Sequence, residues 1–244
     1  MSNPNIASLT NVATCQRALQ LAQSRANGFP GMVTFYGPSG LGKTVAATYA
    51  ANKFNAIHIE CRSVWTTATP LLRAILKEMH IDPAKKPIYE MADMVAKELA
   101  DSGRCLIVDE FDYLVTKKII DVIRDIHDAS DAAILLIGEE NLPTKLRAWE
   151  RFHNRVLDWF VANPATKDDA AELAKINCQT ITVADDLLDD LLITVRGNVR
   201  RICTNLDKIK EVAKVKGLKT ISLADWKNSG EIFNTGDPAP RRIR

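Results

Sequence analysis

The chain has 244 residues, a formal net charge of +2, 46% hydrophobic residues and 25% charged residues, which is the balance of an ordinary globular protein. Its five scattered cysteines contain no CxxC pair, so they indicate neither a zinc site nor a disulfide framework. No apolar run reaches the roughly 18 residues that span a membrane, and the N-terminus lacks the regions of a signal peptide. We therefore expect a cytoplasmic protein with no membrane partner.

Strand and helix signals alternate along the first two thirds of the sequence. In chain order, the expected elements are a helix over 8–26, a strand over 32–36, a helix over 43–54, a strand over 56–60, helices over 70–80 and 88–101, a strand over 104–108, a helix over 119–129, a strand over 132–137, a helix over 142–151 and a strand over 156–159. Such alternation is typical of parallel crossover units. It predicts an α/β fold whose five-stranded parallel sheet is covered by helices.

The strand signal stops after Asn163 and Pro164. We therefore divide the chain into an N-terminal helix and linker (1–30), an α/β core (31–163) and a small helical lid subdomain (164–232). The last segment, 233–244, contains Gly, two Pro and three Arg and is expected to be a flexible basic tail. Its arginines Arg241, Arg242 and Arg244 are candidates for contacts with DNA or a protein partner, unless the tail is merely disordered.

A glycine-rich phosphate-binding loop follows the first expected strand. The sequence from Gly37 to Thr44 matches GxxxxGK[ST] in full, and it opens a helix, as the motif requires. Backbone N–H groups of such a loop and the helix N-terminus bind phosphates. We expect Lys43 to bridge the β- and γ-phosphates of ATP and Thr44 to bind Mg²⁺. The expected nucleotide-binding residues are Gly37, Pro38, Ser39, Gly40, Leu41, Gly42, Lys43, Thr44, Val45 and Asp109.

A second motif is the apolar strand that ends in Asp109 and Glu110. Asp109 is expected to hold Mg²⁺, directly or through water, and Glu110 to polarise the attacking water as a general base. One further strand, 56–60, lies between the two motifs. A glutamate beside the magnesium aspartate, together with this extra strand, fits the additional-strand branch of P-loop ATPases better than small GTPases or nucleotide kinases.

Polar residues elsewhere are candidates for sensing or stabilising the γ-phosphate. Glu139 and Asn141 follow the strand over 132–137, although they also suit a polar turn that starts a helix. Arg155 and then Arg151 are the candidates for reaching the ATP of a neighbouring subunit, the alternative being a surface salt bridge. Arg200, which opens a helix in the lid, can contact the γ-phosphate in the same chain or form a solvated helix start.

Together these motifs resemble the AAA+ ATPases: a phosphate loop, an Asp-Glu strand, a sensor strand, an arginine before the last strand and a helical lid with GxxR. Within that superfamily the chain most resembles the MuB and TnsC type of target-DNA activators. The matching stretches are 31–33 (GMV), 109–114 (DEFDYL) and 123–128 (IRDIHD), the last being followed by the Leu-Leu-Ile-Gly strand.

The resemblance implies an ATPase that assembles as a helical filament on double-stranded DNA, without sequence specificity. It also implies recruitment of a transposase, which stimulates hydrolysis, and target immunity; a phage-encoded chain would act in the cytoplasm of its bacterial host. Only about 30 residues precede the phosphate loop, too few for the N-terminal helix-turn-helix domain of the phage activator. Any DNA binding is therefore expected from the core or the lid.

Cations near DNA phosphates are needed for non-specific DNA binding. The candidates are Arg62, Trp65 and Thr66 after the second strand, and Lys117 and Lys118 after the Asp-Glu motif. Trp65 can instead pack in the core, and the lysines can be solvated. Two other functions remain open: a helicase-loader type of AAA+ ATPase, and a nucleotide-dependent switch that binds no nucleic acid.

Overall fold

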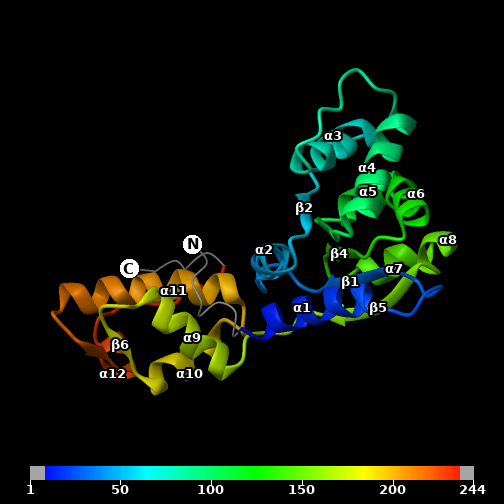
Figure 1. Cartoon of the computed structure of the whole chain (residues 1–244). Coiled ribbons are helices and arrows are strands. Elements are labelled where there is room, and N and C mark those ends of the chain that lie inside the picture. The colour runs from blue at the N-terminus through cyan, green and yellow to red at the C-terminus, as the bar shows by residue number, and fades with distance from the viewer. Residues whose placement is uncertain (1–8, 237–244) are drawn as a thin grey trace. The chain divides into compact units, whose positions relative to one another are not determined.

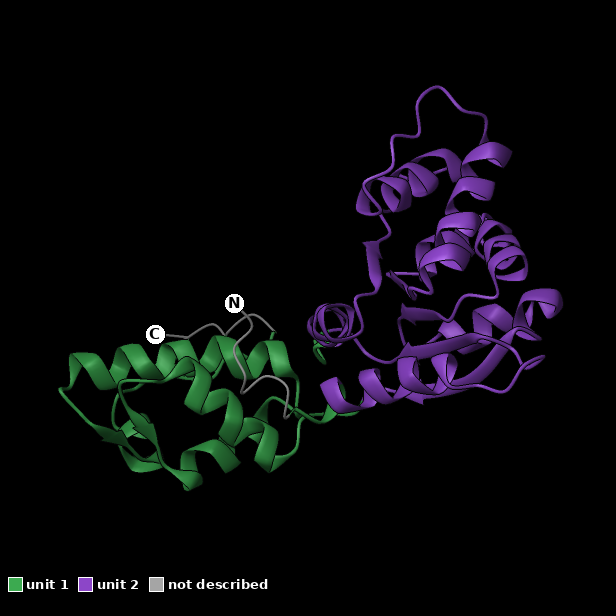
Figure 2. Ribbon diagram, in the orientation of Figure 1, with its two compact units in different colours: residues 1–11, 40–42, 163–244 green, residues 12–39, 43–162 purple. Residues whose placement is uncertain are grey.

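A computed structural model describes residues 9–236, which form two compact units (Figure 2). The sheet unit comprises residues 12–39 and 43–162. The C-terminal unit comprises residues 163–236 together with two short segments, 9–11 and 40–42, from earlier in the chain. The tip of the glycine-rich loop is thus part of the C-terminal unit, whereas the rest of that loop is part of the sheet unit.

The sheet unit contains a parallel sheet with the strand order β2-β3-β4-β1-β5 (Figure 1). All four strand pairs are parallel, as predicted from the alternation of strands and helices. The strands are β1 Met32–Tyr36, β2 Ile57–Glu60, β3 Leu106–Asp109, β4 Ile134–Gly138 and β5 Val156–Val161. The expected α/β fold with a five-stranded parallel sheet is confirmed.

Eight helices accompany the sheet within the described residues. They are α1 Thr10–Gln23, α2 Lys43–Phe54, α3 Ala68–Glu78, α4 Ile88–Ser102, α5 Asp112–Thr116, α6 Asp121–Ser130, α7 Leu142–Arg147 and α8 Glu150–His153. The single helix predicted over 142–151 is wrong, because Trp149 has a non-helical backbone (φ −118°, ψ 69°) that separates α7 from α8. The short helix α5 was not predicted. Within residues 9–236, no helix is both long enough and apolar enough to cross a membrane.

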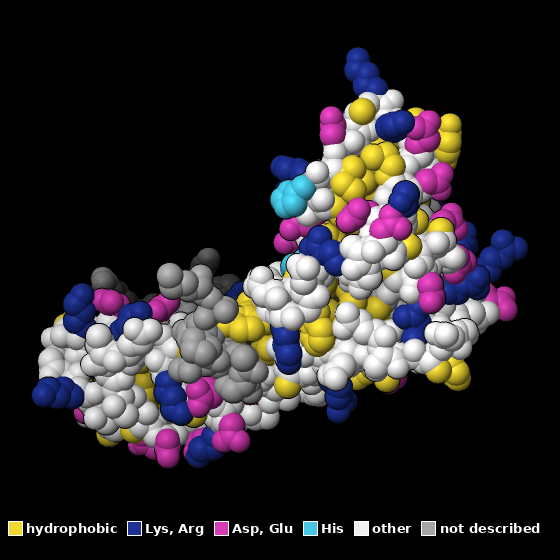
Figure 3. Space-filling view, viewed as in Figure 1, with side chains coloured by type: hydrophobic (Ala, Val, Ile, Leu, Met, Phe, Trp, Pro, Cys, Tyr) yellow, Lys and Arg dark blue, Asp and Glu magenta, His cyan; other side chains and the backbone are white. Residues whose placement is uncertain are grey.

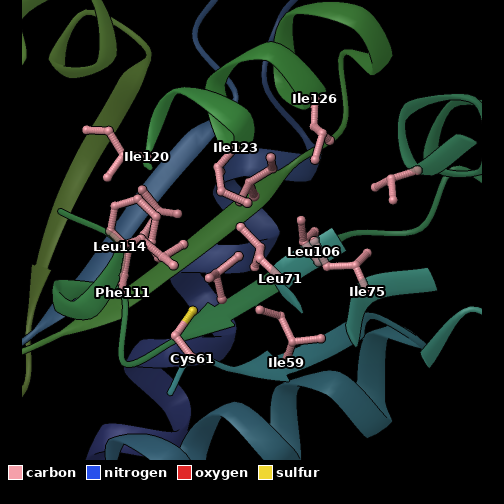
Figure 4. Packing of buried hydrophobic residues seen from close by; sticks show 14 of the residues in the cluster. Ile59, Cys61, Leu71, Ile75, Leu106, Phe111, Leu114, Ile120, Ile123 and Ile126 are labelled. Carbon is pink, nitrogen blue, oxygen red and sulfur yellow. The ribbon is translucent and has the colours of Figure 1, made fainter. Parts of the chain in front are cut away.

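A hydrophobic core fills one face of the sheet (Figure 4). Alternate residues of a strand point to the same face, so Ile57 and Ile59 of β2 join this core together with Leu106 and Val108 of β3. Leucines and isoleucines of α3, α4 and α6 cover it. Phe111 continues the core beyond the end of β3, and its ring lies 5.5 Å from the ring of Phe152. This packing fixes the loop that follows β3, where the acidic motif lies.

The C-terminal unit contains four helices and a pair of short parallel strands. They are α9 Lys167–Asn177, β6 Thr182–Val183, α10 Asp185–Thr194, α11 Val199–Val215, β7 Thr220–Ile221 and α12 Leu223–Lys227. The C-terminal unit is thus mainly helical, as expected, but its strand pair was not predicted, because strands of two residues are too short to show a period in the sequence. Capping boxes start α9 and α12.

The expected tail from 233 onward begins with residues that pack on the C-terminal unit. The ring of Phe233 stacks on Trp226 with a centroid distance of 5.0 Å. The side chain of Asn205 accepts a hydrogen bond from the N–H of Asn234 and donates one to its carbonyl. An aromatic stack and a paired backbone are not features of a free tail. The arginines at 241, 242 and 244 lie outside the described residues.

Candidate nucleotide site

Three loops meet at the carboxyl edge of the sheet. Strands β1, β3 and β4 are parallel neighbours, so the loops that follow them leave the same edge, where ligands of open α/β sheets bind. The N–H of Gly37 donates to the carbonyl of Gly138 at 3.3 Å, and the N–H of Phe111 donates to the carbonyl of Ile137 at 2.8 Å. These bonds hold the glycine-rich loop and the Asp-Glu motif against the end of β4.

The glycine-rich loop has a backbone that requires glycine. Gly40 and Gly42 have φ values of +85° and +82°, which a residue with a Cβ rarely adopts. Lys43 then opens α2, and its Nζ donates to the carbonyls of Gly37 at 2.6 Å and Pro38 at 2.9 Å. The ammonium is thus held within its own loop, where it can exchange these carbonyls for phosphate oxygens. Thr44 and Val45 follow on the first turn and are exposed.

Asp109 has the chemistry of a magnesium ligand. It is only 2% exposed; Oδ1 accepts a hydrogen bond from the N–H of Glu110 at 2.8 Å, whereas Oδ2 is buried with no hydrogen-bond partner among the described residues. A buried carboxylate oxygen without a partner is costly, and a hard cation satisfies it well. Asp109 therefore fits the Mg²⁺ expected from the sequence.

Glu110 has an unusual backbone and a perturbed carboxyl group. Its φ of +53° is in the left-handed region, which is strained for a residue with a side chain. Burial raises the pKa of Glu110, as does the neighbouring charge of Asp109, while Lys43 acts in the opposite direction. Burial likewise lowers the pKa of Lys43, against the attraction of the surrounding acids. A carboxyl with a raised pKa is a better proton acceptor and suits the role of a general base.

Glu139 follows β4, and its exposed side chain contributes to the electrostatics of the same site. Its charge acts on the pKa values of both Lys43 and Glu110. The N–H of Glu139 donates to Oδ2 of Asp112 at 2.6 Å, and Oδ1 of Asp112 accepts from Nζ of Lys145 at the same distance. Neither the buried Asp112 nor its partner Lys145 was predicted from the sequence as a site residue. Asn141 is exposed at the start of α7 and caps no backbone group there.

The two arginines before β5 have different surroundings. Arg155 makes a two-pronged ion pair with Asp128, with Nε–Oδ1 at 3.1 Å and Nη2–Oδ2 at 2.9 Å. That hydrogen bonding raises the pKa of Arg155. Arg151 is exposed on α8, and its side chain has no hydrogen bond or ion pair with any described residue. Arg155 is thus engaged within its own chain, whereas Arg151 is available to another molecule.

Within the C-terminal unit, the loop tip at 40–42 is fixed by backbone contacts. The N–H of Arg200 donates to the carbonyl of Gly40 at 3.0 Å, and a Cβ on Gly40 would lie 2.5 Å from the side-chain nitrogen of Asn198. Nδ2 of the buried Asn11 donates to the carbonyls of Leu41 at 2.9 Å and Asn163 at 2.8 Å. The side chain of Arg200 is exposed. Asn11 was not predicted from the sequence, because it lies in no recognisable motif.

The candidate DNA-binding residues follow β2 and α5. Arg62, Thr66, Lys117 and Lys118 are exposed. Trp65 is partly buried and packs against the hydrophobic core. On the face of the molecule shown in Figure 3, lysines and arginines are interspersed with acidic side chains. Within each unit, the described lysines and arginines on that face therefore form no continuous basic stripe.

Comparisons with known proteins agree with this geometry. Residues 28–146 match the family model described as AAA domain. The Aeropyrum pernix ORC2 protein, solved in ADPNP–ADP complexes, superposes with a TM-score of 0.66 at 13% identity, over 93% of this chain and 68% of that chain. The Aeropyrum pernix ORC1 protein, solved in complex with DNA, gives a TM-score of 0.58 at 17% identity, over 90% and 63%.

Domain III of the Thermotoga maritima replication initiation protein DnaA gives a TM-score of 0.55 at 17% identity, over 92% of this chain and 90% of that chain. The chain thus spans about two thirds of the archaeal proteins and nearly all of this bacterial domain. A comparison with curated proteins found no match. These likenesses show the AAA+ P-loop fold, and the match to the AAA domain model is confined to residues 28–146.

Proposed function

We propose that this protein is an ATPase that assembles on double-stranded DNA in its ATP-bound state and delivers that DNA to a transposase. The observation that carries the ATPase part is the meeting of Lys43, Asp109 and Glu110 at one edge of the sheet, with the orphaned Oδ2 of Asp109 buried there. The solved neighbour that contains DNA supports a DNA-binding role. The transposase rests on the sequence resemblance in residues 109–114 and 123–128.

The proposed chemistry assigns one task to each residue. Lys43 and the loop amides bind and orient the phosphates of ATP, and Thr44 and Asp109 hold Mg²⁺. The bound Mg²⁺ would supply positive charge that offsets the charge of the phosphates. Glu110 accepts the proton of the water that attacks the γ-phosphate. Its raised pKa makes this transfer more favourable than at an ordinary glutamate.

Assembly requires a group that completes the site of a neighbouring subunit. Arg151 is the better candidate for this task, because Arg155 is already bound to Asp128. An exposed arginine without a partner retains all five N–H donors for a phosphate. We assign Arg155 the task of bracing the segment that carries Arg151, since Nη1 of Arg155 donates to the carbonyl of Arg151 at 3.3 Å.

A helicase-loader type of ATPase is the second candidate. The fold similarity to domain III of the replication initiation protein DnaA favours it. The two functions differ in the DNA that they bind and in their protein partner. Preference for single strands would support the loader, whereas preference for duplex DNA supports the transposition activator. The third possibility, a switch that binds no nucleic acid, predicts ATP hydrolysis without DNA binding in any nucleotide state.

The deciding experiment measures binding to a fluorescent random-sequence duplex without nucleotide, with ADP and with a slowly hydrolysed ATP analogue. We expect cooperative, salt-sensitive binding only with the ATP analogue, since phosphate contacts release counterions. A single strand of the same length is the control for the loader. Absence of duplex binding in every state, with ATP hydrolysis intact, would refute the proposal.

Four variants test the assigned roles. Lys43→Ala is expected to lose ATP binding, and Glu110→Gln to bind ATP but hydrolyse it slowly and so trap assemblies. Arg151→Ala is expected to lose hydrolysis and assembly together, whereas Arg155→Lys should retain the ion pair with Asp128 and most of the activity. If Arg151→Ala were fully active and Arg155→Lys inactive, the two arginines would have to exchange roles.

A further inference from the structure

A buried acid links the end of β4 to α7 beside the nucleotide site, and neither the motif roles nor the proposed mechanism uses it. Asp112 is the first residue of α5, and its side chain is 8% exposed. Oδ2 accepts from the N–H of Glu139, and Oδ1 accepts from Nζ of Lys145, both at 2.6 Å. A charged group with so little access to water needs such partners.

The fit around this carboxylate is tight. A Cβ on Gly138 would clash with Oδ2 of Asp112 and lie 2.8 Å from Cδ2 of Leu142. A residue with a Cβ at this position would therefore have to displace both side chains. The carboxylate is packed directly against the backbone that joins β4 to α7, and it sets the path of residues 138–142.

The same residue contributes charge to the nucleotide site. Burial lowers the pKa of Lys43, and the negative charges of Glu110, Asp109, Glu139 and, least of all, Asp112 act in the opposite direction. A further negative charge near the γ-phosphate opposes binding of ATP more than binding of ADP. Lys145 pairs with Oδ1 of Asp112, whereas the N–H of Glu139 donates to Oδ2, so the pair can position the loop without this electrostatic penalty.

We propose that Asp112 is a positioning residue, which fixes the loop after β4 beside Glu110 and Lys43, and that Lys145 neutralises it so that ATP is accepted. The proposal rests on the proposed ATPase activity but not on DNA binding. It explains why an acid, Asp112, lies three residues after Asp109 and why α7 carries Lys145. Removing Asp112 should disorganise the loop, and removing Lys145 should leave the loop in place but disfavour ATP.

The test compares Asp112→Ala, Lys145→Met and the double variant Asp112→Asn/Lys145→Met with wild type. In Asp112→Ala, we expect hydrogen exchange of the 138–142 amides in the nucleotide-free protein to rise by about tenfold, since one hydrogen bond is lost. We expect kcat to fall roughly tenfold or more, with the affinity for ADP nearly unchanged. Asp101→Ala, which breaks the exposed pair with Lys97, is the matched control and should change neither quantity.

For Lys145→Met, we expect weaker binding of the ATP analogue relative to ADP. The double variant keeps an acceptor for the N–H of Glu139 and carries no charge, so its preference for ATP over ADP should return. Wild-type exchange and wild-type kcat in Asp112→Ala would overturn the proposal. If Asp112→Ala fails to fold, the double variant Asp112→Asn/Lys145→Met takes its place. Fast hydrogen exchange at residues 138–142 in the double variant, or no recovery of its preference for ATP over ADP, would overturn the proposal. A protein that binds no DNA leaves all of these measurements intact.

Discussion

The buried His127 makes the stability of the sheet unit depend on pH in a way that can be worked out from its hydrogen bonds. Nε2 lies 3.3 Å from the N–H of Gly31, and Nδ1 lies 2.9 Å from the carbonyl of Ala132. Because the Gly31 N–H can only donate, Nε2 must accept, and the single ring proton is on Nδ1. The folded protein therefore holds this histidine neutral.

The direction of the effect follows from the pKa. Burial lowers the pKa of His127, as does Arg25, whereas the bond to Ala132 and the charges of Asp128 and Asp131 act in the other direction. The unfolded chain takes up a proton at the ordinary histidine pKa of about 6.5. Since the folded pKa is lower, stability is complete above this pH and falls as the pH drops below it, by at most about 1.4 kcal/mol per pH unit.

The perturbation is His127→Phe, which keeps the ring volume but removes both hydrogen bonds. It leaves one buried N–H and one buried carbonyl without a partner, at a cost of about 2–4 kcal/mol in the free energy of unfolding. Urea unfolding followed by tryptophan fluorescence, from about pH 5.5 to pH 8, measures both effects. Burial also lowers the pKa of His58, which adds its own pH dependence. The quantity to follow is therefore the difference in unfolding free energy between His127→Phe and wild type at each pH. A difference that does not change with pH would refute this account.

Three further predictions concern the nucleotide site. Asn11→Ala should lower the unfolding free energy by about 3 kcal/mol, since three hydrogen bonds are lost; urea unfolding measures this, and a loss below about 1 kcal/mol would contradict it. Gly40→Ala should weaken binding of a fluorescent ATP analogue at least about tenfold, because of its positive φ and its contact with Asn198; Asn198→Ala should restore part of the affinity. The kcat for ATP should fall as the pH drops through the raised pKa of Glu110, and a rate that is flat down to the ordinary glutamate range would contradict the role of general base.

Local patterns in the sequence predict the elements that are long or repetitive. β1 and α2 begin and end where they were predicted, because a run of apolar residues, a glycine-rich loop and a helix follow one another there. Helix α5 was missed because it has only five residues, and β6 and β7 because each has two. The break between α7 and α8 depends on the backbone of one residue, Trp149, which no pattern reveals.

The site shows the same limit. The phosphate loop and the Asp-Glu motif are each one unbroken stretch of sequence. The residue types and their spacing were therefore sufficient to identify both. The pairs Asp112–Lys145 and Asp128–Arg155 join residues 33 and 27 positions apart, and only the tertiary structure brings them together. Arg155 was therefore predicted ahead of Arg151, because no local pattern shows that Asp128 already binds Arg155.

The left-handed backbone of Glu110 (φ +53°) places stability and activity in conflict at this position. Glycine adopts such a conformation without strain, and asparagine at a smaller cost than most residues. The variants Glu110→Gly and, to a smaller extent, Glu110→Asn are therefore expected to raise the free energy of unfolding, by about 1 kcal/mol for glycine. In a library randomised at this codon, selection for heat resistance should enrich glycine and asparagine, whereas selection for turnover should retain glutamate. The opposition between the two selections would identify the position as one maintained for chemistry rather than for folding.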